Sequence, residues 1–388
     1  MWVIFTGNMM FTLHLIAHCS KICSNHFLKD LMKIRHATPA DNQALLELSR
    51  RSPMAAQLVV NNDRTPDYFF IDELLGEKSL ILVAEEAGRI IGTVAVVFRK
   101  VLYRNELIPI AYIGGIKIEN PAQNRLLAFR LMKYVMNFLM DTPVKFGFIL
   151  VIGANRAMEA LLSGRAGIPQ FDLVSRYRVK NIVLLPGRGL SGRYQIRSAR
   201  TDDLGVMASM YRQFFSDYEL KPDWTEQYLA WLYRQKDYYL ENTQLAFQND
   251  SLVAALSLWD QTRFKNTVIS HYGGKYAILK KISSPLRLVP EAGQALSELV
   301  IRHLVFREGF ADAARDLIRL AIANHRRKYR FLRCGFPLGS APARILERFP
   351  GLSIPVNFYT VFRPSDPERE SMVDHLRRSP VWEDLSLH

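Results

Sequence analysis

The stretch Ile110–Leu139 reads IAYIGGIKI (Ile110–Ile118), ENPAQN (Glu119–Asn124) and RLLAFRLMKYVMNFL (Arg125–Leu139). The first part is an apolar run with two glycines, and the second is a short polar turn that contains Pro121. In the third part apolar residues recur at helical spacing, at Leu127, Leu131, Val135 and Leu139. The pattern predicts a strand, a turn and a helix whose first backbone N–H groups form an anion site. A plain crossover from strand to helix is the alternative.

The length and composition favour two globular domains. The chain has 388 residues, of which 49% are hydrophobic and 23% are charged, and an ordinary domain has roughly 100–200 residues. The formal net charge of +14 suits an anionic partner such as a nucleic acid, a membrane surface or a phosphate-bearing cofactor. No long run of Lys and Arg selects one of these partners, and basic residues spread over solvated faces are the alternative.

The three cysteines, Cys19, Cys23 and Cys334, form neither a metal-ligand pattern nor a disulfide framework. They indicate a reducing compartment, and we expect a cytoplasmic protein. Residues 1–19 are apolar but lack the basic start and the cleavage site of a signal peptide. Because Met32 opens a natural first strand and helix, we expect residues 1–31 to be an upstream extension outside the fold.

The chain contains an internal repeat. KIRHATPADNQALLELSRR, from Lys33, matches QIRSARTDDLGVMASMYRQ, from Gln195, and the same offset places LVAEEAGRIIGTVAV, from Leu82, on QLAFQNDSLVAALSL, from Gln244. The offset is 244 − 82 = 162 residues in the second pair and 195 − 33 = 162 in the first. A register kept over so long a span indicates a duplicated unit.

The repeat divides the chain into a first unit (32–185), a Gly- and Arg-rich linker (186–193), a second unit (194–363) and a tail (364–388). Each unit is predicted to begin with a strand, a turn and an amphipathic helix, followed by antiparallel strands. In the first unit, FGFILVIGA precedes a helix that begins at Asn155, and residues 171–185 are predicted to form closing strands. The tail is predicted to hold one short helix and a terminal strand, SPVWEDLSL.

The order of these elements resembles the GNAT superfamily of acyl-CoA N-acyltransferases. The residues that carry the resemblance are IRHATPADNQALLEL, LVAEEAGRIIGTVAV, GGIKIENPAQNRLLAFRLM and NRAMEALLSGRAGI. The resemblance covers residues 32–185 well and repeats more weakly over 194–363. It implies an α/β fold with a mixed sheet, in which two GNAT-like units stand in tandem. The first unit would bind the cofactor, and the second would be degenerate.

The resemblance also implies where coenzyme A would bind. In the family, backbone amides after the fourth strand wrap the pyrophosphate, and an Asn after the fifth strand contacts the pantetheine arm. The matching Asn is Asn155, and Gly167-Ile168 stands at the usual Gly-Phe position. The matching phosphate turn consists of Asn124, Arg125, Leu126, Leu127, Ala128 and Phe129. It departs from the family because it contains no glycine, although its amides and the Arg125 side chain can still meet a phosphate.

Acyl transfer requires a neutral amine, a donor for the developing oxyanion and an acid for the departing thiolate. The strand amides of Ile116, Lys117 and Ile118 are the predicted donors to the thioester carbonyl. Glu119, at the end of that strand, is the candidate base, with a solvated turn residue as the alternative. The family's acidic Tyr is replaced by Leu162, so Tyr112 and Tyr177 are candidate acids, although most such tyrosines pack in a core.

Other classes of function have less support. The nine histidines show no metal-binding spacing, and no nucleophile elbow or phosphate-binding P-loop occurs. The aromatic residues between Trp224 and Tyr239 suit base stacking or, at their helical spacing, an amphipathic helix. We therefore predict acetyl transfer from acetyl-CoA to an amine of a small molecule or a protein. A non-catalytic acyl-CoA-binding module is the alternative, and a nucleic-acid-associated protein is the third.

Overall fold

The structure is a computed structural model that describes residues 32–52, 58–121, 124, 126–153, 155–165, 167–187, 189–274, 277–278, 280–281 and 290–388. The predictions for residues 1–31, Cys19 and Cys23 among them, lie outside the described residues. No helix in the described part of the chain is long and apolar enough to cross a membrane.

The first half of the chain begins with a strand, a turn and a helix and later has adjacent antiparallel strands, as predicted. Its elements are β1 (Met32–His36), a 3-10 turn (Pro39–Asp41), α2 (Asn42–Arg51), β2 (Leu58–Asp63), α3 (Phe70–Leu75), β3 (Lys78–Glu86), β4 (Arg89–Tyr103), β5 (Glu106–Ile118), α4 (Leu127–Met140), β6 (Gly147–Ile152), α5 (Arg156–Leu161) and β7 (Asp172–Val183).

The second half repeats this order. Its elements are β8 (Gln195–Ser198), a 3-10 turn (Thr201–Asp203), α6 (Leu204–Phe214), α7 (Glu226–Leu232), a 3-10 turn (Leu240–Asn242), β9 (Thr243–Gln248), β10 (Ser251–Trp259), β11 (Asn266–Tyr272), β12 (Glu298–Phe306), α9 (Ala311–His325), β13 (Phe331–Pro337), α10 (Ala341–Leu346), β14 (Gly351–Val361) and α11 (Arg369–Arg378).

The repeat is visible in matching local contacts. Arg35 donates to Asp41 at 2.8 Å in the first half, and Arg197 donates to Asp203 at 2.7 Å in the second, in each case through both terminal nitrogens of the guanidinium. The hairpin after β3 turns at Ala87 with a φ of 47°, and the hairpin after β9 turns at Asn249 with a φ of 49°. These contacts sit at the same offset as the sequence match, so the predicted duplication is confirmed.

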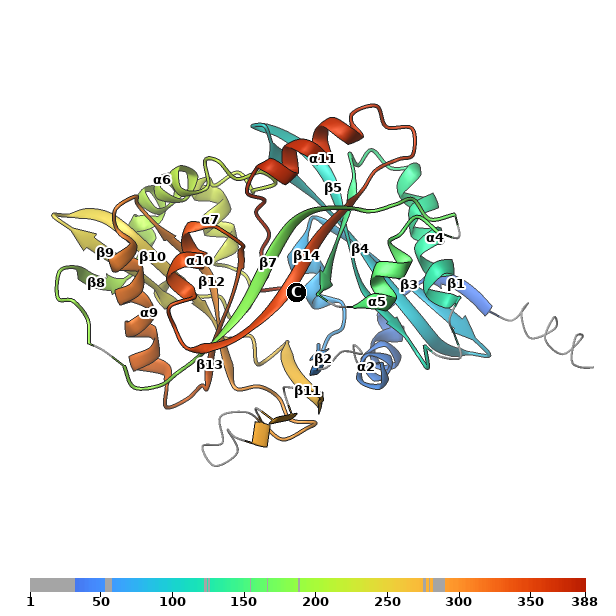
Figure 1. Cartoon of the computed structure of the whole chain (residues 1–388), viewed down its shortest axis with the longest axis horizontal. Helices are drawn as coiled ribbons and strands as arrows, with labels where there is room; N and C mark the ends of the chain where they lie inside the picture. Colours follow the sequence, from blue (N-terminus) through green and yellow to red (C-terminus); the bar gives the residue numbers. More distant parts are fainter. Residues whose placement is uncertain are drawn as a thin grey trace, which may run out of the picture.

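The two halves share one mixed sheet. Among the described residues, twelve strands run in the order β1-β3-β4-β5-β6-β14-β7-β13-β12-β10-β9-β8, and β2 pairs with β11 in a separate ribbon (Figure 1). Neighbouring strands are antiparallel except for two pairs, β5 with β6 and β12 with β13. The predicted α/β mixed sheet with two related halves is therefore present.

The halves exchange their last strands. β14 pairs with β6 of the first half on one side and with β7 on the other, while β7 pairs with β13 of the second half. The prediction of several closing strands at 171–185 was wrong, because β7 is a single long strand and β14 takes the place beside β6. The domain boundaries at 185 and 194 stay a prediction, since the exchange places residues of one predicted unit within the sheet of the other.

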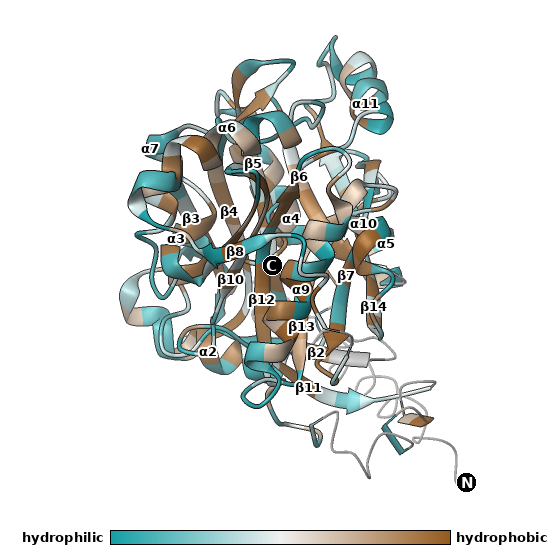
Figure 2. Ribbon diagram, turned by 90° about the vertical axis from the view of Figure 1, so that its left-hand side faces the viewer, coloured by the Kyte–Doolittle hydropathy of each residue, from teal (hydrophilic) through white to brown (hydrophobic). Residues whose placement is uncertain are grey.

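Side chains of one strand pack under different helices because they alternate across the sheet. On β3, Ile81 and Val83 pack with the apolar face of α2, whereas Leu82 and Ala84 pack with the apolar face of α4. The two helices therefore cover opposite faces of the first half. Hydrophobic residues gather along the central strands, and hydrophilic residues dominate α11 (Figure 2).

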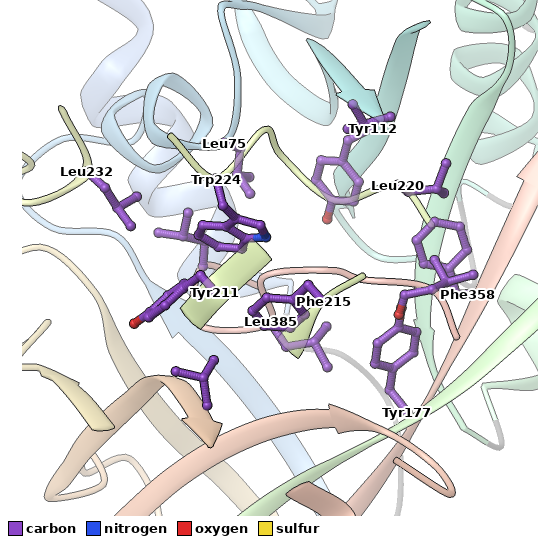
Figure 3. Close-up of a cluster of buried hydrophobic side chains, with 14 of the residues drawn as sticks. Leu75, Tyr112, Tyr177, Tyr211, Phe215, Leu220, Trp224, Leu232, Phe358 and Leu385 are labelled. Carbon is purple, nitrogen blue, oxygen red and sulfur yellow. The ribbon is translucent and has the colours of Figure 1, made fainter. Parts of the chain in front are cut away.

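A large apolar cluster joins the halves. It contains Tyr112 of the first half, Tyr211 and Trp224 of the second, and Leu385 of the tail (Figure 3). Trp224 and Tyr238 are buried, and only the residues Glu226–Leu232 of the aromatic segment form helix α7. The structure therefore favours a packing role for most of this segment over base stacking.

The tail, all of which the structure describes, contains the predicted helix but lacks the predicted terminal strand after it. The predicted short helix is α11, but the predicted terminal strand is wrong: Val381 forms one isolated bridge with Glu219. Side chains anchor the segment that follows instead, since Glu383, Asp384 and Ser386 are buried among partners from distant parts of the chain. This tail segment, residues 381–388, forms part of the site described next.

Candidate functional site

The strands β5 and β6 separate in the middle of the sheet. They pair only through Ala111 with Gly147 and Tyr112 with Phe148, although β5 continues to Ile118 and β6 to Ile152. The ladder hydrogen bonds that parallel neighbours normally exchange are thus absent along the described remainder of both strands. The first splay, as we call this opening, exposes the backbone edges of both strands.

A β-bulge in β5 accompanies the first splay. The pairing with β4 shifts between Thr93, opposite Lys117, and Ala95, opposite Gly114, so β5 has one extra residue there. Gly115 sits in the bulge with a φ of 61°, a conformation that a residue with a Cβ rarely adopts. A Cβ at Gly114 would also collide with the Tyr112 hydroxyl. The two glycines therefore bend β5 and leave room for the Tyr112 ring.

The first splay opens into a cavity of about 260 Å³. The cavity lies between the halves, because its walls come from β5 and β6, from α3, from the exchanged strands β7 and β14, from β11 and from the tail segment. Most of the lining is apolar. The charged or titratable side chains that line it include Arg64, Lys117, Lys280, Glu298, Arg333 and His388.

The predicted cofactor residues divide into two groups. Ile116, Lys117 and Asn155 line the cavity, whereas Ile118 is buried in the core beside it. The Asn155 side chain caps helix α5, since its Oδ1 accepts a hydrogen bond from the Met158 amide at 3.2 Å. Whether these residues bind a cofactor stays a prediction.

The predicted phosphate turn lies at the start of α4. Arg125 lies outside the described residues. Asn124 folds back on the preceding strand end, because its side-chain nitrogen donates to the Glu119 carbonyl at 2.7 Å. The Leu127 amide donates to the Asn124 carbonyl at 3.0 Å, and the Leu126 side chain is 67% exposed. Leu127 is buried, and Ala128 and Phe129 pack against the same core.

Glu119 lies beside two arginines and away from the cavity lining. Its carboxylate pairs with Arg89, and Arg51 lies 3.6 Å from Oε1. These contacts hold the carboxylate at the outer end of β5. Its predicted catalytic role stays a prediction.

The two candidate tyrosines differ in position. Tyr112 lines the cavity beside the last paired residues of the first splay, and burial raises the pKa of its hydroxyl well above 10. Tyr177 is buried, and its hydroxyl donates to the Val381 carbonyl at 2.6 Å. Leu162, at the position of the family's acidic Tyr, is buried in the apolar core under α4. Of these residues, Tyr112 alone lines the cavity.

The cavity wall also contains polar groups that no sequence motif indicates. Arg64 pairs with the fully buried Asp72 at 2.6 Å. Glu298 accepts from the Thr267 hydroxyl at 2.6 Å through Oε1, while its buried Oε2 has no hydrogen-bond partner among the described residues. Arg64 precedes α3, which contains Asp72, whereas Thr267 and Glu298 come from β11 and β12. No sequence motif predicts either pair.

Lys117 stands out among the cavity residues. Burial, with a smaller effect from the positive charge of Arg64, lowers the pKa of Lys117 from 10.5 to about 8. Its ammonium nitrogen donates to the Asn61 side-chain oxygen at 3.1 Å and to the Ser52 carbonyl at 3.3 Å. The lysine was predicted to contribute its backbone amide, and the structure adds a side chain that loses its proton at a lower pH than an ordinary lysine.

The second half has a corresponding separation that is filled. β12 and β13 pair from Glu298 with Phe331 to Val300 with Arg333 and then diverge. The tail segment occupies this second splay and leaves about 50 Å³. Arg302 of β12 pairs with Asp384 at 2.8 Å, and a Cβ at Gly335 would collide with the Leu385 side chain. The open splay is therefore in the first half, where the cofactor was predicted.

The described residues that line the cavity form no metal site. Within the residues that the structure describes, no three His, Cys, Asp or Glu side chains gather in a metal-binding arrangement. Cys334 is a free, buried thiol in the wall of the second splay.

Comparisons with known proteins support the fold and leave the activity open. No protein-family model matches the chain, and no curated protein matches it in sequence. A solved GCN5-related N-acetyltransferase from Sphaerobacter thermophilus matches with a TM-score of 0.58 and 14% identity, over 87% of this chain and 98% of that one. N-myristoyltransferase from Saccharomyces cerevisiae with bound myristoyl-CoA matches with a TM-score of 0.55 and 13% identity, over 87% and 80%.

A second structure of the yeast enzyme with myristoyl-CoA gives a TM-score of 0.56 and 11% identity, over 85% of this chain and 82% of that one. These similarities extend over both halves. They confirm the predicted resemblance at the level of fold: the chain has the mixed-sheet fold of the GNAT N-acyltransferases in a tandem arrangement.

Proposed function

We propose that this protein transfers an acyl group from an acyl-CoA to an amine in the cavity of the first half. The observation that carries the proposal is the open first splay, which leads into a cavity lined by Ile116, Lys117 and Asn155, three residues that the sequence had assigned to the cofactor. The filled second splay supports a single cofactor site for the tandem pair. The fold similarity to known N-acyltransferases supports the same class of reaction by analogy.

In the proposed complex the pantetheine arm lies between β5 and β6. Beyond Tyr112 and Phe148 the described backbone groups of β5 and β6 do not pair with each other. An extended pantetheine arm can hydrogen-bond to these groups in the way that an added strand would. The bulge at Gly115 turns the β5 backbone. The amides of Ile116 and Ile118, which alternate away from β4, supply donors for the oxyanion that develops on the thioester carbonyl, whereas the Lys117 amide faces Thr93 of β4. Tyr112, near the closed end of the splay, is placed to protonate the departing thiolate.

Acetyl-CoA is the donor that the sequence predicts. The cavity wall extends well past the strands that would hold a thioester, through Ile71, Leu75, Val179 and Ile354. This apolar wall also accommodates a longer acyl chain, because each buried CH₂ contributes about 0.8 kcal/mol. A chain-length series of acyl-CoAs therefore belongs in the first assay. The acceptor is proposed to be an amine of a small molecule or a protein, and the cytoplasm remains the predicted location.

The alternative is a module that binds acyl-CoA without turnover. The glycine-free turn favours it, since the Leu127 amide is already bonded to the Asn124 carbonyl and the bulky Leu126 is exposed at the helix start. Calorimetry with coenzyme A and acyl-CoAs tests binding, and release of free thiol over a panel of amines tests transfer. Binding with turnover supports the enzyme, and binding without turnover on any amine supports the module. No binding at millimolar ligand contradicts both.

A further inference from the structure

The tail segment brings one histidine to the closed end of the first splay. The His388 ring lines the cavity and lies edge to face against Tyr112, with 4.6 Å between ring centres. Tyr112 is the last residue of β5 that pairs with β6. In the proposed complex, the reacting end of the acyl-CoA lies near this point. His388 is thus the imidazole nearest to the proposed chemistry among the described residues that line the cavity.

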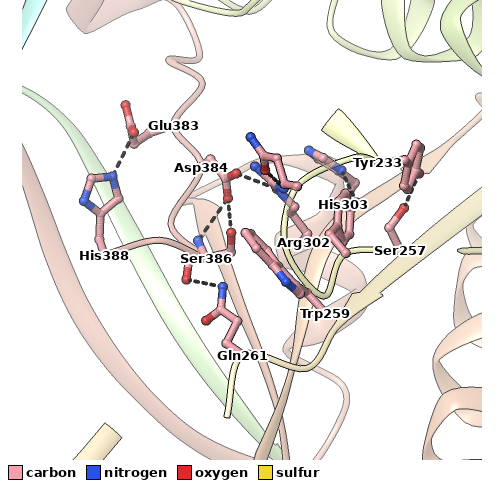
Figure 4. Close-up of polar contacts among 12 residues, drawn as sticks. Tyr233, Ser257, Trp259, Gln261, Arg302, His303, Glu383, Asp384, Ser386 and His388 are labelled. Atoms are coloured by element: carbon pink, nitrogen blue, oxygen red, sulfur yellow. Dashed lines mark hydrogen bonds and ion pairs between the residues drawn. The ribbon is translucent and has the colours of Figure 1, made fainter. Parts of the chain in front are cut away.

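A buried carboxylate holds the His388 ring. The Nε2 atom of His388 lies 2.9 Å from Oε1 of Glu383, which is fully buried (Figure 4). Arg99 pairs with both oxygens of the same carboxylate, at 3.1 Å to Oε1. Burial alone would raise the pKa of Glu383, but Arg99 and the hydrogen bond from His388 hold this pKa below its ordinary value. The carboxylate is therefore ionised and accepts a hydrogen from Nε2.

The charges around His388 keep its ring neutral. Burial lowers its pKa below 6.5, against the effect of Glu383, and the positive charges of Arg99 and Lys265 lower it further. Lys265 and Arg333 also fix the residue from the other side, since each donates to the His388 backbone oxygen at 2.8 Å.

Glu298 adds a negative charge to the cavity lining and lies 3.5 Å from Arg333. A neutral ring that donates from Nε2 carries its lone pair on Nδ1. No hydrogen bond joins Nδ1 to another of the described residues.

We propose, on the basis of the proposed N-acyltransfer, that His388 is the general base of the reaction and that Glu383 is its positioning residue. The amine nitrogen attacks the thioester carbon, a C–N bond forms, and Nδ1 of His388 takes the proton that the nitrogen loses. The C–S bond then breaks, its electron pair leaves on sulfur, and the thiolate takes a proton from Tyr112 or from water. The imidazolium returns its proton to solvent, Tyr112 regains from solvent any proton that it gave to the thiolate, and the net products are an amide and free coenzyme A.

The first test replaces His388 in the full-length protein. His388→Gln should lower kcat by roughly 10²- to 10⁴-fold, the usual contribution of a general base, and should leave the Kd for acyl-CoA unchanged. Exogenous imidazole should restore part of the turnover of His388→Ala. The matched control is His375→Gln, because His375 makes a similar contact, 2.8 Å from Nε2 to Oε1 of Glu219, outside the cavity lining.

The pH profile of kcat/KM separates His388 from Lys117 as the base. A His388 base gives an acidic limb below pH 6.5, whereas a Lys117 base gives a limb near pH 8. NMR of ¹⁵N-histidine in the wild type adds a measurement that needs no turnover, and it should show a neutral His388 ring protonated on Nε2 at pH 7. Retained turnover in His388→Gln, a limb near pH 8 that survives this substitution, or a ring protonated on Nδ1 would each overturn the dyad.

Failure of the dyad and failure of the proposed function give different results. If the wild type transfers acyl groups and His388→Gln does so equally well, the dyad is wrong and N-acyltransfer stands. If the wild type turns over no amine while it binds acyl-CoA, the proposed function fails, and the dyad fails with it.

Discussion

The buried charge of Lys117 should lower the free energy of unfolding at neutral pH. Replacement of Lys117 by methionine should restore part of this free energy. The lysine is enclosed by protein at the cavity wall, and its pKa falls from 10.5 to about 8. One unit of pKa corresponds to about 1.4 kcal/mol, so the cost of the charged form at pH 7 is of the order of 3 kcal/mol. Lys117→Met removes this cost and keeps most of the side-chain volume.

The variant also loses favourable contacts. The ammonium donates to Asn61 and to the Ser52 carbonyl, and each hydrogen bond contributes about 1 kcal/mol. Asn61 keeps a contact at 3.4 Å from the Ser49 hydroxyl. The net expectation is therefore a gain of about 1 kcal/mol in the free energy of unfolding at pH 7.

The sign of the pH dependence follows from proton binding. Between pH 8 and 10.5 the unfolded chain binds a proton at Lys117 that the folded chain has lost, so the stability of the wild type rises with pH across this window. The advantage of the methionine variant should shrink over the same range and reverse above it, where only the lost hydrogen bonds remain.

Urea unfolding at pH 7, 9 and 10.5 measures the difference, with Lys33→Met, at an exposed position of β1, as the control. A variant that is less stable at pH 7 by a margin that does not change with pH would refute the reasoning.

Three further outcomes test the architecture. Asn155→Ala should lower the free energy of unfolding by about 1 kcal/mol through loss of the α5 cap. If Asn155 binds pantetheine, the same substitution should also lower the affinity for coenzyme A measured by calorimetry. Gly335→Ala should lower the melting temperature, because its Cβ collides with Leu385, and overpacking costs about 1–3 kcal/mol. Arg99→Met should cost about 3–5 kcal/mol in urea unfolding, because Glu383 is left buried without its charged partner; a loss below 1 kcal/mol would show that the carboxylate is not buried as an ion.

Features that depend on local pattern could be predicted from the sequence. The repeat was visible because Arg35 and Asp41 recur as Arg197 and Asp203, and these residues form the same short-range ion pair in each half. The strand and the helix around Glu119 followed from the change in hydrophobic period. Two of the predicted cavity residues, Ile116 and Asn155, were placed by resemblance to a family whose fold the structure confirms.

Features that depend on distant partners could not be predicted. β7 and β14 both alternate buried and partly exposed residues. Neither sequence indicates that β14 will pair with β6 and β7 with β13. The tail segment looked like a strand because its apolar residues are interspersed with polar ones. Its acidic residues are buried only because Arg99 and Arg302, 284 and 82 residues away, meet them. Such pairs leave no spacing that a sequence pattern can reveal.

The tail segment explains how a duplicated unit can carry a single site. Both halves have a pair of parallel strands that diverge, so each half could in principle admit a ligand. The buried pair of Arg302 with Asp384 and the Leu385 side chain close the second splay, and the same few residues continue into the wall of the first cavity, where they deliver His388. Packing of the tail segment against the second half therefore also places His388 in the cavity of the first half. A substitution such as Gly335→Ala, made in the second half, should consequently reduce turnover in the first half through displacement of His388 and leave coenzyme A affinity less affected.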